Sequence, residues 1–257
     1  MSDLHAPIGV FDSGMGGISV LKELVRLMPN ENYLFFGDSA HAPYGIRSVE
    51  EVKYLTLQAT EHLLERGCKA IVVACNTATS AAITTLRARW QEMPIIGLEP
   101  ALKPAVLACP DGRVLVMATP LTLREHKFAA LMQRYQQQAT ILTQPAPDLV
   151  EFVERAELDS AELLHYLCML LRPYIEEPVD SVVLGCTHFP FAQAMIREAL
   201  GYPVRFFDGG AGAARETARL LARAELRNPV AEAGKVEFET SGKREERLPL
   251  FRILLNK

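Results

Sequence analysis

The sequence has little excess charge and no long apolar run. Its 257 residues carry 27 Lys and Arg against 31 Asp and Glu, a formal charge of −4. This mildly acidic balance argues against direct nucleic-acid binding, which relies on a basic surface. No segment approaches the roughly 18 uninterrupted apolar residues of a membrane helix, and the first residues lack the pattern of a secretory signal. We therefore expect a cytoplasmic protein with no membrane contact.

Common cofactor and metal motifs are also missing. The glycines of the first loop fall at positions 14, 16 and 17. That spacing is not GxGxxG, and no Gly-Lys-Ser/Thr follows it. There is no CxxC or HExxH pair, which argues against a zinc site. The five cysteines are an odd number, which does not indicate a disulfide scaffold. We expect them to be reduced thiols.

The chain does contain a regular alternation of short apolar runs and longer amphipathic segments. Hydrophobic residues make up 49% and charged residues 23%, as in globular proteins and unlike disordered chains. The length fits one large domain or two small ones. We predict strands buried on both faces at residues 8–11, 33–36, 70–74, 95–98, 114–118, 140–143, 181–185 and 204–207. We predict helices at about 18–28, 48–66, 78–90, 121–137, 161–175, 191–200 and 211–226.

Strands alternating with helices predict a parallel α/β architecture. Ser48 and Glu51 have capping-box spacing at one helix start, and Gly67 fits that helix's end. Beyond Leu226 the pattern changes. Residues 235–240 and 248–254 flank a charged turn, and we predict from them a terminal hairpin at a sheet edge.

Two segments of the sequence echo each other. Residues 70–77, AIVVACNT, and residues 181–188, SVVLGCTH, each give an apolar strand, a cysteine and two polar residues. Cys186 follows Cys75 by 111 residues, a plausible half-chain repeat. Ligands of parallel sheets bind at the carboxyl ends of strands. Two α/β halves facing each other would place one cysteine on each side of a cleft. We interpret Cys68, Cys109 and Cys168 as packing residues.

The loops after the first two predicted strands offer further polar groups. The first, FDSGMGG, puts Asp12 at a strand's carboxyl end, followed by glycines whose exposed N–H groups favour an anion. A tight loop with no ligand is the alternative. The second, GDSAHAPYG, is a polar loop shaped by Pro and Gly. Its Tyr44 could equally line a ligand site or pack within the loop.

The two cysteines suggest proton transfer. A thiol at a helix N-terminus is shifted toward thiolate, and free cysteine titrates near ~8.5, so a small downward shift makes a usable base. Inverting a stereocentre needs one acid/base group on each face of the carbon. Asn76, Thr77 and Thr187 can hydrogen-bond a carboxylate or an amino group, and His188 could assist the second thiol.

These features together resemble the glutamate racemase family, within the aspartate/glutamate racemase superfamily. The matching segments are GVFDSGMGG at 9–17, PYG at 43–45, ACNTATS at 74–80 and LGCTHFP at 184–190. The resemblance covers essentially the whole chain. It implies two pseudo-symmetric parallel-sheet α/β domains with the active site in the cleft between them. The implied boundaries are 1–97 with 208–257 for the first domain and 98–207 for the second.

The resemblance also implies chemistry and residue roles. The family interconverts L- and D-glutamate without pyridoxal phosphate, metal or other cofactor, and supplies D-glutamate for peptidoglycan. Cys75 corresponds to the base for D-glutamate and Cys186 to the base for L-glutamate. Asp12, His188 and Glu154 correspond to assisting catalytic groups. The implied substrate contacts are Asp12, Ser13, Tyr44, Gly45, Asn76, Thr77, Thr187 and His188.

The resemblance implies partners as well, and alternatives stay open at this point. Family members commonly form homodimers, and some depend on a UDP-linked muramyl precursor as activator. A related aspartate or hydantoin racemase, or a single-thiol decarboxylase, is one alternative, although two intact cysteines oppose the decarboxylase. A mixed zinc site of Asp12, Cys75, Cys186 and His188 is another. A non-catalytic ligand-binding module is the third.

Overall fold

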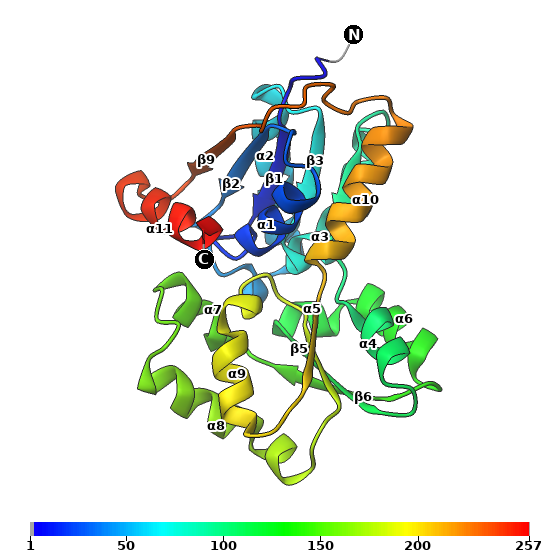
Figure 1. The fold of residues 1–257 in the computed structure, drawn as a ribbon, viewed down its shortest axis with the longest axis vertical. Coiled ribbons are helices and arrows are strands. Elements are labelled where there is room, and N and C mark those ends of the chain that lie inside the picture. Colours follow the sequence, from blue (N-terminus) through cyan, green and yellow to red (C-terminus); the bar gives the residue numbers. More distant parts are fainter. Residues whose placement is uncertain (1–2, 257) are drawn as a thin grey trace.

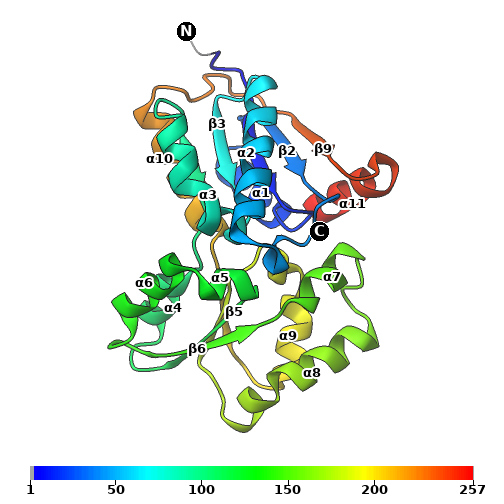
Figure 2. The same cartoon turned by 180° about the vertical axis from the view of Figure 1, so that it is seen from behind.

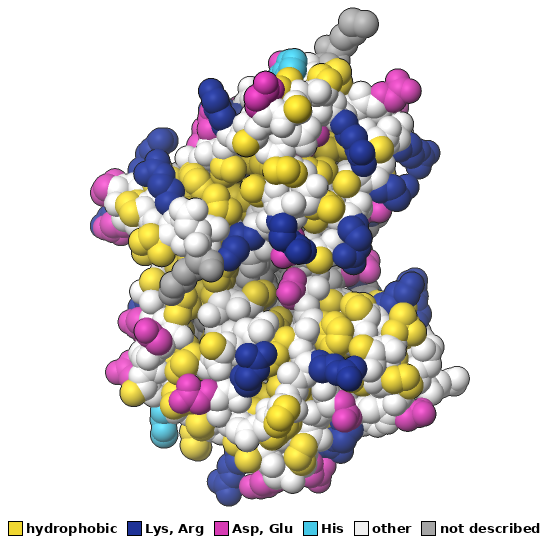
Figure 3. All heavy atoms as spheres, in the orientation of Figure 1, with side chains coloured by type: hydrophobic (Ala, Val, Ile, Leu, Met, Phe, Trp, Pro, Cys, Tyr) yellow, Lys and Arg dark blue, Asp and Glu magenta, His cyan; other side chains and the backbone are white. Residues whose placement is uncertain are grey.

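The computed structural model, which describes residues 3–256, contains two parallel sheets with helices on both faces (Figure 1). We call the part around the first sheet the first domain and the part around the second sheet the second domain. The first sheet has the order β4-β3-β1-β2-β9 and the second the order β6-β5-β7-β8. Figure 3 shows acidic and basic side chains interspersed over one face of the molecule. The molecule is narrower where the two domains meet than across either domain.

The first sheet consists of β1 (Ile8–Asp12), β2 (Tyr33–Gly37), β3 (Ala70–Val73), β4 (Ile95–Gly97) and β9 (Val236–Thr240). Alternate side chains of a strand point to opposite faces. Val10 therefore packs with α1 (Ile18–Leu27), α10 (Gly210–Arg223) and α11 (Arg244–Asn256). Its neighbour Phe11 packs with α2 (Val49–Glu65) and α3 (Asn76–Arg89). Figure 2 shows the α2 and α3 side of this three-layer domain.

The second sheet consists of β5 (Arg113–Ala118), β6 (Thr140–Pro145), β7 (Ser181–Leu184) and β8 (Arg205–Asp208). One face is covered by α7 (Asp148–Glu154), α8 (Ala161–Glu176) and α9 (Gln193–Leu200). The other is covered by α4 (Leu102–Ala108) and α6 (His126–Tyr135). The chain crosses between the sheets after β4 and after β8. The predicted domain boundaries at 97/98 and 207/208 stay predictions.

Most of the predicted elements are present with small shifts of their ends. The Ser48 hydroxyl accepts the Glu51 N–H at 3.2 Å, so the predicted helix cap is confirmed. Gly67 follows α2 with a φ of +77°, a left-handed conformation that favours glycine. Within residues 3–256, no helix is both long enough and apolar enough to cross a membrane.

The predicted terminal hairpin is wrong. Its first segment forms β9, which pairs in parallel with β2, and its second segment is helical and belongs to α11. A short apolar run does not distinguish a strand from a helix. Here the helix is favoured because Leu248, Phe251 and Leu254 recur at helical spacing and pack on the first domain's core.

Other predictions need smaller corrections. Strands β6 and β8 are partly exposed and not buried on both faces, because they are the outer strands of their sheet. The helix predicted at 121–137 is two helices, α5 (Pro120–Arg124) and α6, separated by Glu125 in extended conformation. Two short helices, α4 and α7, were not predicted.

Candidate functional site

The predicted cleft residues gather where the carboxyl ends of the two sheets meet. Asp12 ends β1, Cys75 lies two residues beyond β3, and Cys186 lies two residues beyond β7. All three side chains are buried. The Thr187 hydroxyl in the second domain donates to Asp12 Oδ1 in the first domain at 3.0 Å. The Ser19 hydroxyl of α1 donates to the Thr187 carbonyl at 2.9 Å. The domains are therefore closed on one another at this point.

Cys75 caps a helix, as its position in the sequence predicted. It precedes α3, and its sulfur accepts the Ala78 N–H at 3.4 Å while the thiol donates to Ser13 Oγ at 3.6 Å. Burial, and then the negative charge of Asp12, raise the pKa of the Cys75 thiol to about 12, against the weaker opposing effects of these hydrogen bonds. The expected shift of this thiol toward thiolate is wrong for the closed structure.

Cys186 has a different neighbourhood. It is followed by a 3-10 turn, η2 (Phe189–Ala192), and not directly by an α-helix. His188 lies beside it, with Nδ1 3.7 Å from the Cys186 sulfur and Nε2 2.7 Å from Glu154 Oε1. Burial would lower the pKa of His188, but the hydrogen bonds and negative charges of Cys186 and Glu154 raise it well above its usual value. The protonated ring of His188 is therefore held between the Glu154 carboxylate and the Cys186 sulfur.

Glu154 connects α7 to three other groups. Its Oε1 accepts the Met15 N–H of the glycine loop at 2.7 Å in addition to His188, and its Oε2 accepts Arg247 Nη1 at 2.9 Å. Burial alone would raise the pKa of Glu154, but these donors and their positive charges lower it. The anion predicted for the N–H groups of the glycine loop is, in this structure, the carboxylate of Glu154.

The glycine loop needs its glycines because the second domain approaches so closely. A Cβ at Gly14 would lie 1.9 Å from the Glu154 carboxylate, and one at Gly16 would lie 2.4 Å from the His188 ring. Asp12 turns back onto the same loop and accepts the Gly14 N–H at 3.0 Å. Burial raises the pKa of Asp12, and the opposing effects of His188, Gly14 and Thr187 are smaller.

The remaining predicted contacts lie at the same junction. Tyr44 is buried, and its hydroxyl donates to Asp38 Oδ2 at 2.6 Å. A Cβ at Gly45 would meet the side chain of Thr119 at 2.5 Å, so this loop also packs tightly against the second domain. The Thr77 hydroxyl bonds to Thr119 and Thr122 across the junction at 3.0 and 3.2 Å.

Asn76 differs from these residues in having an open hydrogen-bonding group. Its side chain is buried, and its Oδ1 has no hydrogen-bond partner among residues 3–256. Leaving a buried acceptor unpaired costs about 1–3 kcal/mol. Asn76 also borders a small cavity of about 10 Å³ that Cys186, Thr187 and Asp208 line. The unpaired oxygen is therefore available to a ligand in the cleft.

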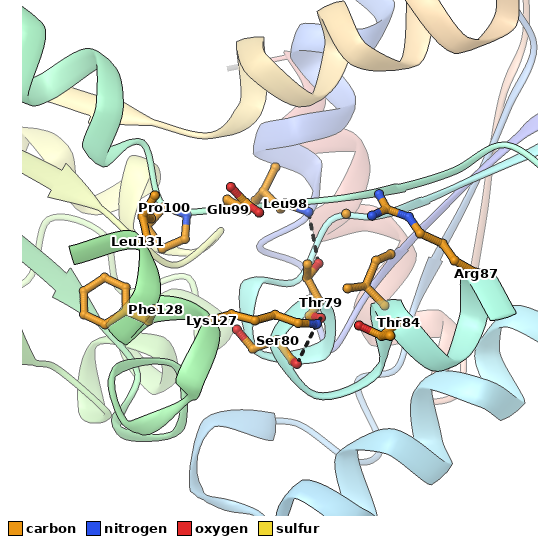
Figure 4. A pocket seen from close by; sticks show the side chains of 12 residues that line it. Thr79, Ser80, Thr84, Arg87, Leu98, Glu99, Pro100, Lys127, Phe128 and Leu131 are labelled. Atoms are coloured by element: carbon orange, nitrogen blue, oxygen red, sulfur yellow. Dashed lines mark hydrogen bonds between the residues drawn. The ribbon is translucent and has the colours of Figure 1, made fainter. Parts of the chain in front are cut away.

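A larger pocket lies at the first crossing between the domains. Its volume is about 250 Å³, and its walls come from α3, the segment 97–100 and α6. Figure 4 shows Arg87 and Lys127 extending toward this pocket, with Lys127 Nζ donating to the carbonyls of Thr79 and Ser80 at 3.4 and 3.2 Å.

The part of the chain that the structure describes contains no group of three or more His, Cys, Asp or Glu arranged to hold a metal ion.

Sequence reasoning missed several residues that complete the junction. Thr119 and Thr122 form the hydroxyl cluster with Thr77, and Arg247 pairs with Glu154 across the domains. Thr119 had a local signal, because Thr before Pro is typical of a helix start, and it caps α5. Arg247 had no such signal, since its partner lies 93 positions away.

Comparisons with known proteins agree with this geometry. Residues 8–217 match the family described as Asp/Glu/Hydantoin racemase. A glutamate racemase of Clostridium botulinum is 46% identical over 99% of both chains. Two solved structures, each with a TM-score of 0.84, are also similar. The Escherichia coli glutamate racemase in complex with L-glutamate and the activator UDP-MurNAc-Ala is 32% identical, covering 97% of this chain and 95% of that one. The Francisella tularensis glutamate racemase in complex with D-glutamate is 25% identical, covering 99% and 95%.

Near full-length matches at this identity, and a family model that spans most of the chain, decide the classification. The two-domain fold is the same as in the solved relatives. The chain belongs to the Asp/Glu/Hydantoin racemase family of isomerases, among its glutamate racemases.

Proposed function

We propose that this protein interconverts L- and D-glutamate by two-sided proton transfer between Cys75 and Cys186, without pyridoxal phosphate or metal. The observation that carries the proposal is the meeting of two buried cysteines from opposite domains in one closed cleft, each with its own polar partners. A carbon held between two such groups can lose a proton on one face and gain one on the other. The D-glutamate product would supply cytoplasmic peptidoglycan synthesis.

The surroundings of the two thiols support a direction for each. With a pKa of about 12, Cys75 is a neutral thiol near pH 7 and a ready proton donor. Cys186 lies beside His188, whose raised pKa keeps a positively charged ring next to the sulfur. We assign Cys186 to remove the α-proton of L-glutamate while Cys75 donates to the opposite face. In the reverse direction the two exchange roles, with Asp12 assisting Cys75 and Glu154 holding His188.

Substrate contacts follow from the groups that surround the thiols. We propose that the unpaired Asn76 Oδ1 accepts a hydrogen bond from the substrate ammonium, because that would satisfy a buried acceptor. Ser13, Thr77, Thr187 and the loop at Tyr44–Gly45 would hold the two carboxylates by hydroxyl and N–H donors. The 10 Å³ cavity has room for about one water molecule and not for an amino acid. The domains must therefore separate to admit glutamate.

Circular dichroism with purified protein tests this function. L-Glutamate incubated without pyridoxal phosphate should lose its signal, and in deuterium oxide the D-glutamate formed should carry deuterium at Cα. Replacing either Cys75 or Cys186 by Ala should lower racemisation by roughly 10²-fold or more. Cys168→Ala is the matched control, since Cys168 lies in α8 among the second domain's core residues. Turnover of aspartate but not glutamate, or full activity after both replacements, would reject the proposal.

We further propose that the pocket at the domain crossing receives an anionic activator of the UDP-linked muramyl type. Arg87 and Lys127 supply the cations that a diphosphate needs, and both domains contribute to the lining. The expected result is faster racemisation on adding UDP-MurNAc-Ala, and less of that gain in Lys127→Gln. An unchanged rate of racemisation in the parent protein would contradict this proposal.

Homodimer formation stays a prediction, to be measured by light scattering.

A further inference from the structure

The C-terminal helix reaches the candidate site through one side chain. Helix α11 belongs to the first domain, where Phe251 is fully buried and packs edge-on against Phe35 with ring centroids 5.2 Å apart. One turn earlier, Arg247 extends to the second domain. Its Nη1 donates at 2.9 Å both to the Glu154 carbonyl and to Glu154 Oε2. A single guanidinium therefore fixes the main chain and the carboxylate of the same residue.

The bond to Arg247 constrains how Glu154 meets His188. Oε1 is used by Met15 N–H and His188 Nε2, and Oε2 is used by Arg247. Without the guanidinium, Oε2 would face the pocket of about 270 Å³ that Ser39, Pro43, Arg155 and Arg247 help to line. The carboxylate could then rotate toward water, and His188 would lose the partner that orients its ring toward Cys186.

We propose that Arg247 is a positioning residue that holds Glu154, and through it His188, in place beside Cys186. The inference rests on the proposed function, because it assigns Arg247 to the Cys186 half of the proton transfer. The Cys75 half has no corresponding contact with α11: its polar partners are Ser13 and the Ala78 N–H. Loss of Arg247 should therefore slow the proton transfer at Cys186 and not the proton transfer at Cys75.

The direct test compares Arg247→Gln with Arg252→Gln, an exposed arginine on the same helix. L- and D-glutamate have equal free energies, so kcat/KM must fall equally in both directions in any variant. We expect a fall of roughly tenfold for Arg247→Gln, the size associated with a lost hydrogen bond to a charged group, and no change for Arg252→Gln. Arg247→Lys should fall between them, because Lys keeps the charge but not the planar fork.

Isotope effects distinguish positioning from a general structural defect. In Arg247→Gln, the deuterium isotope effect on kcat/KM should rise with α-deuterated L-glutamate, whose proton leaves to Cys186, and fall with α-deuterated D-glutamate. A smaller fraction of folded protein would move neither value. Unchanged isotope effects in an active parent enzyme would overturn the role of Arg247. No racemisation by the parent protein would instead overturn the proposed function. If Arg247→Gln does not fold, the same measurement on Arg247→Lys decides.

Discussion

The two cysteines of the cleft follow equivalent strands but have unlike surroundings. Cys75 is at the start of α3 and has only neutral hydrogen-bond partners, Ser13 and the Ala78 N–H. Cys186 lies beside a chain of charged groups that runs from His188 through Glu154 to Arg247. Burial and the charge of Asp12 raise the pKa of the Cys75 thiol and keep it protonated, whereas the His188 ring, whose pKa is raised, lies against the Cys186 sulfur.

The difference shows that a repeated sequence pattern does not repeat its electrostatics. The strand and the cysteine recur, but Cys186 contacts His188, which is held by Glu154 of α7 and through it by Arg247 of α11. The partners of Cys75 are Ser13, in the loop after β1, and the Ala78 N–H of α3. At Cys75 burial is the dominant effect on the pKa, followed by the negative charge of Asp12. The predictions that follow, in order of decreasing effect, test this contrast.

The largest effect is expected from Gly16→Ala, whose new Cβ would meet the Cys186 side of the site at His188. The new Cβ would lie 2.4 Å from His188 Nδ1, so the ring or the loop must move. We expect kcat/KM for glutamate to fall roughly 100-fold, since displacements near 1 Å have costs of that order. Gly212→Ala on α10 is the control, because nothing lies within 4 Å of its Cβ. Equal activity of the two variants would show that the close contact with His188 is dispensable.

The second prediction concerns Cys75 alone. With a pKa of about 12, its thiolate fraction, and so its rate of alkylation by iodoacetamide, should rise about tenfold per pH unit from pH 7 to pH 10. Mass spectrometry of the Cys75 peptide gives the rate without substrate. Asp12→Asn removes the charge that helps to raise this pKa and should speed the labelling. A rate that levels off below pH 9 would contradict the protonated resting state.

The smallest effect is a pH dependence of stability. The pKa of His188 is raised in the folded state. The contribution of His188 to the unfolding free energy is therefore complete below its unfolded-state pKa of about 6.5 and is lost as pH rises through its folded-state pKa. The loss of unfolding free energy in His188→Gln should therefore shrink as pH rises above about 6.5. Denaturant unfolding measures it.

Glu154→Gln should show the opposite trend. The pKa of Glu154 is lowered in the folded state. The contribution of Glu154 to the unfolding free energy is therefore present above its unfolded-state pKa of about 4.3 and is lost as pH falls through its folded-state pKa. For the His188→Gln variant of the previous prediction, a loss of unfolding free energy that grows as pH rises would contradict a charged pair of His188 and Glu154.

The fold was largely predictable because local patterns carry it. Within residues 3–256, strands β1 to β8 lie where short apolar runs predicted them, and β9 lies in the first segment of the predicted hairpin. The capping-box helix begins where Ser48 places it. The failures occur where local pattern is ambiguous. The tail residues Leu248, Phe251 and Leu254 fit either a strand or a helix by composition, and only the packing surface of the first domain favours the helix.

The sequence by itself determined the family, the parallel α/β architecture and the two cysteines beyond their strands, since these follow from motifs and from the period of apolar residues. The proposed roles of the site residues are still to be tested. Only the tertiary structure decided that the Cys75 thiol is protonated and which groups surround each sulfur. Charge depends on burial and on neighbours a few ångströms away. For Cys186 the groups that complete this environment, Glu154 and Arg247, are distant along the chain.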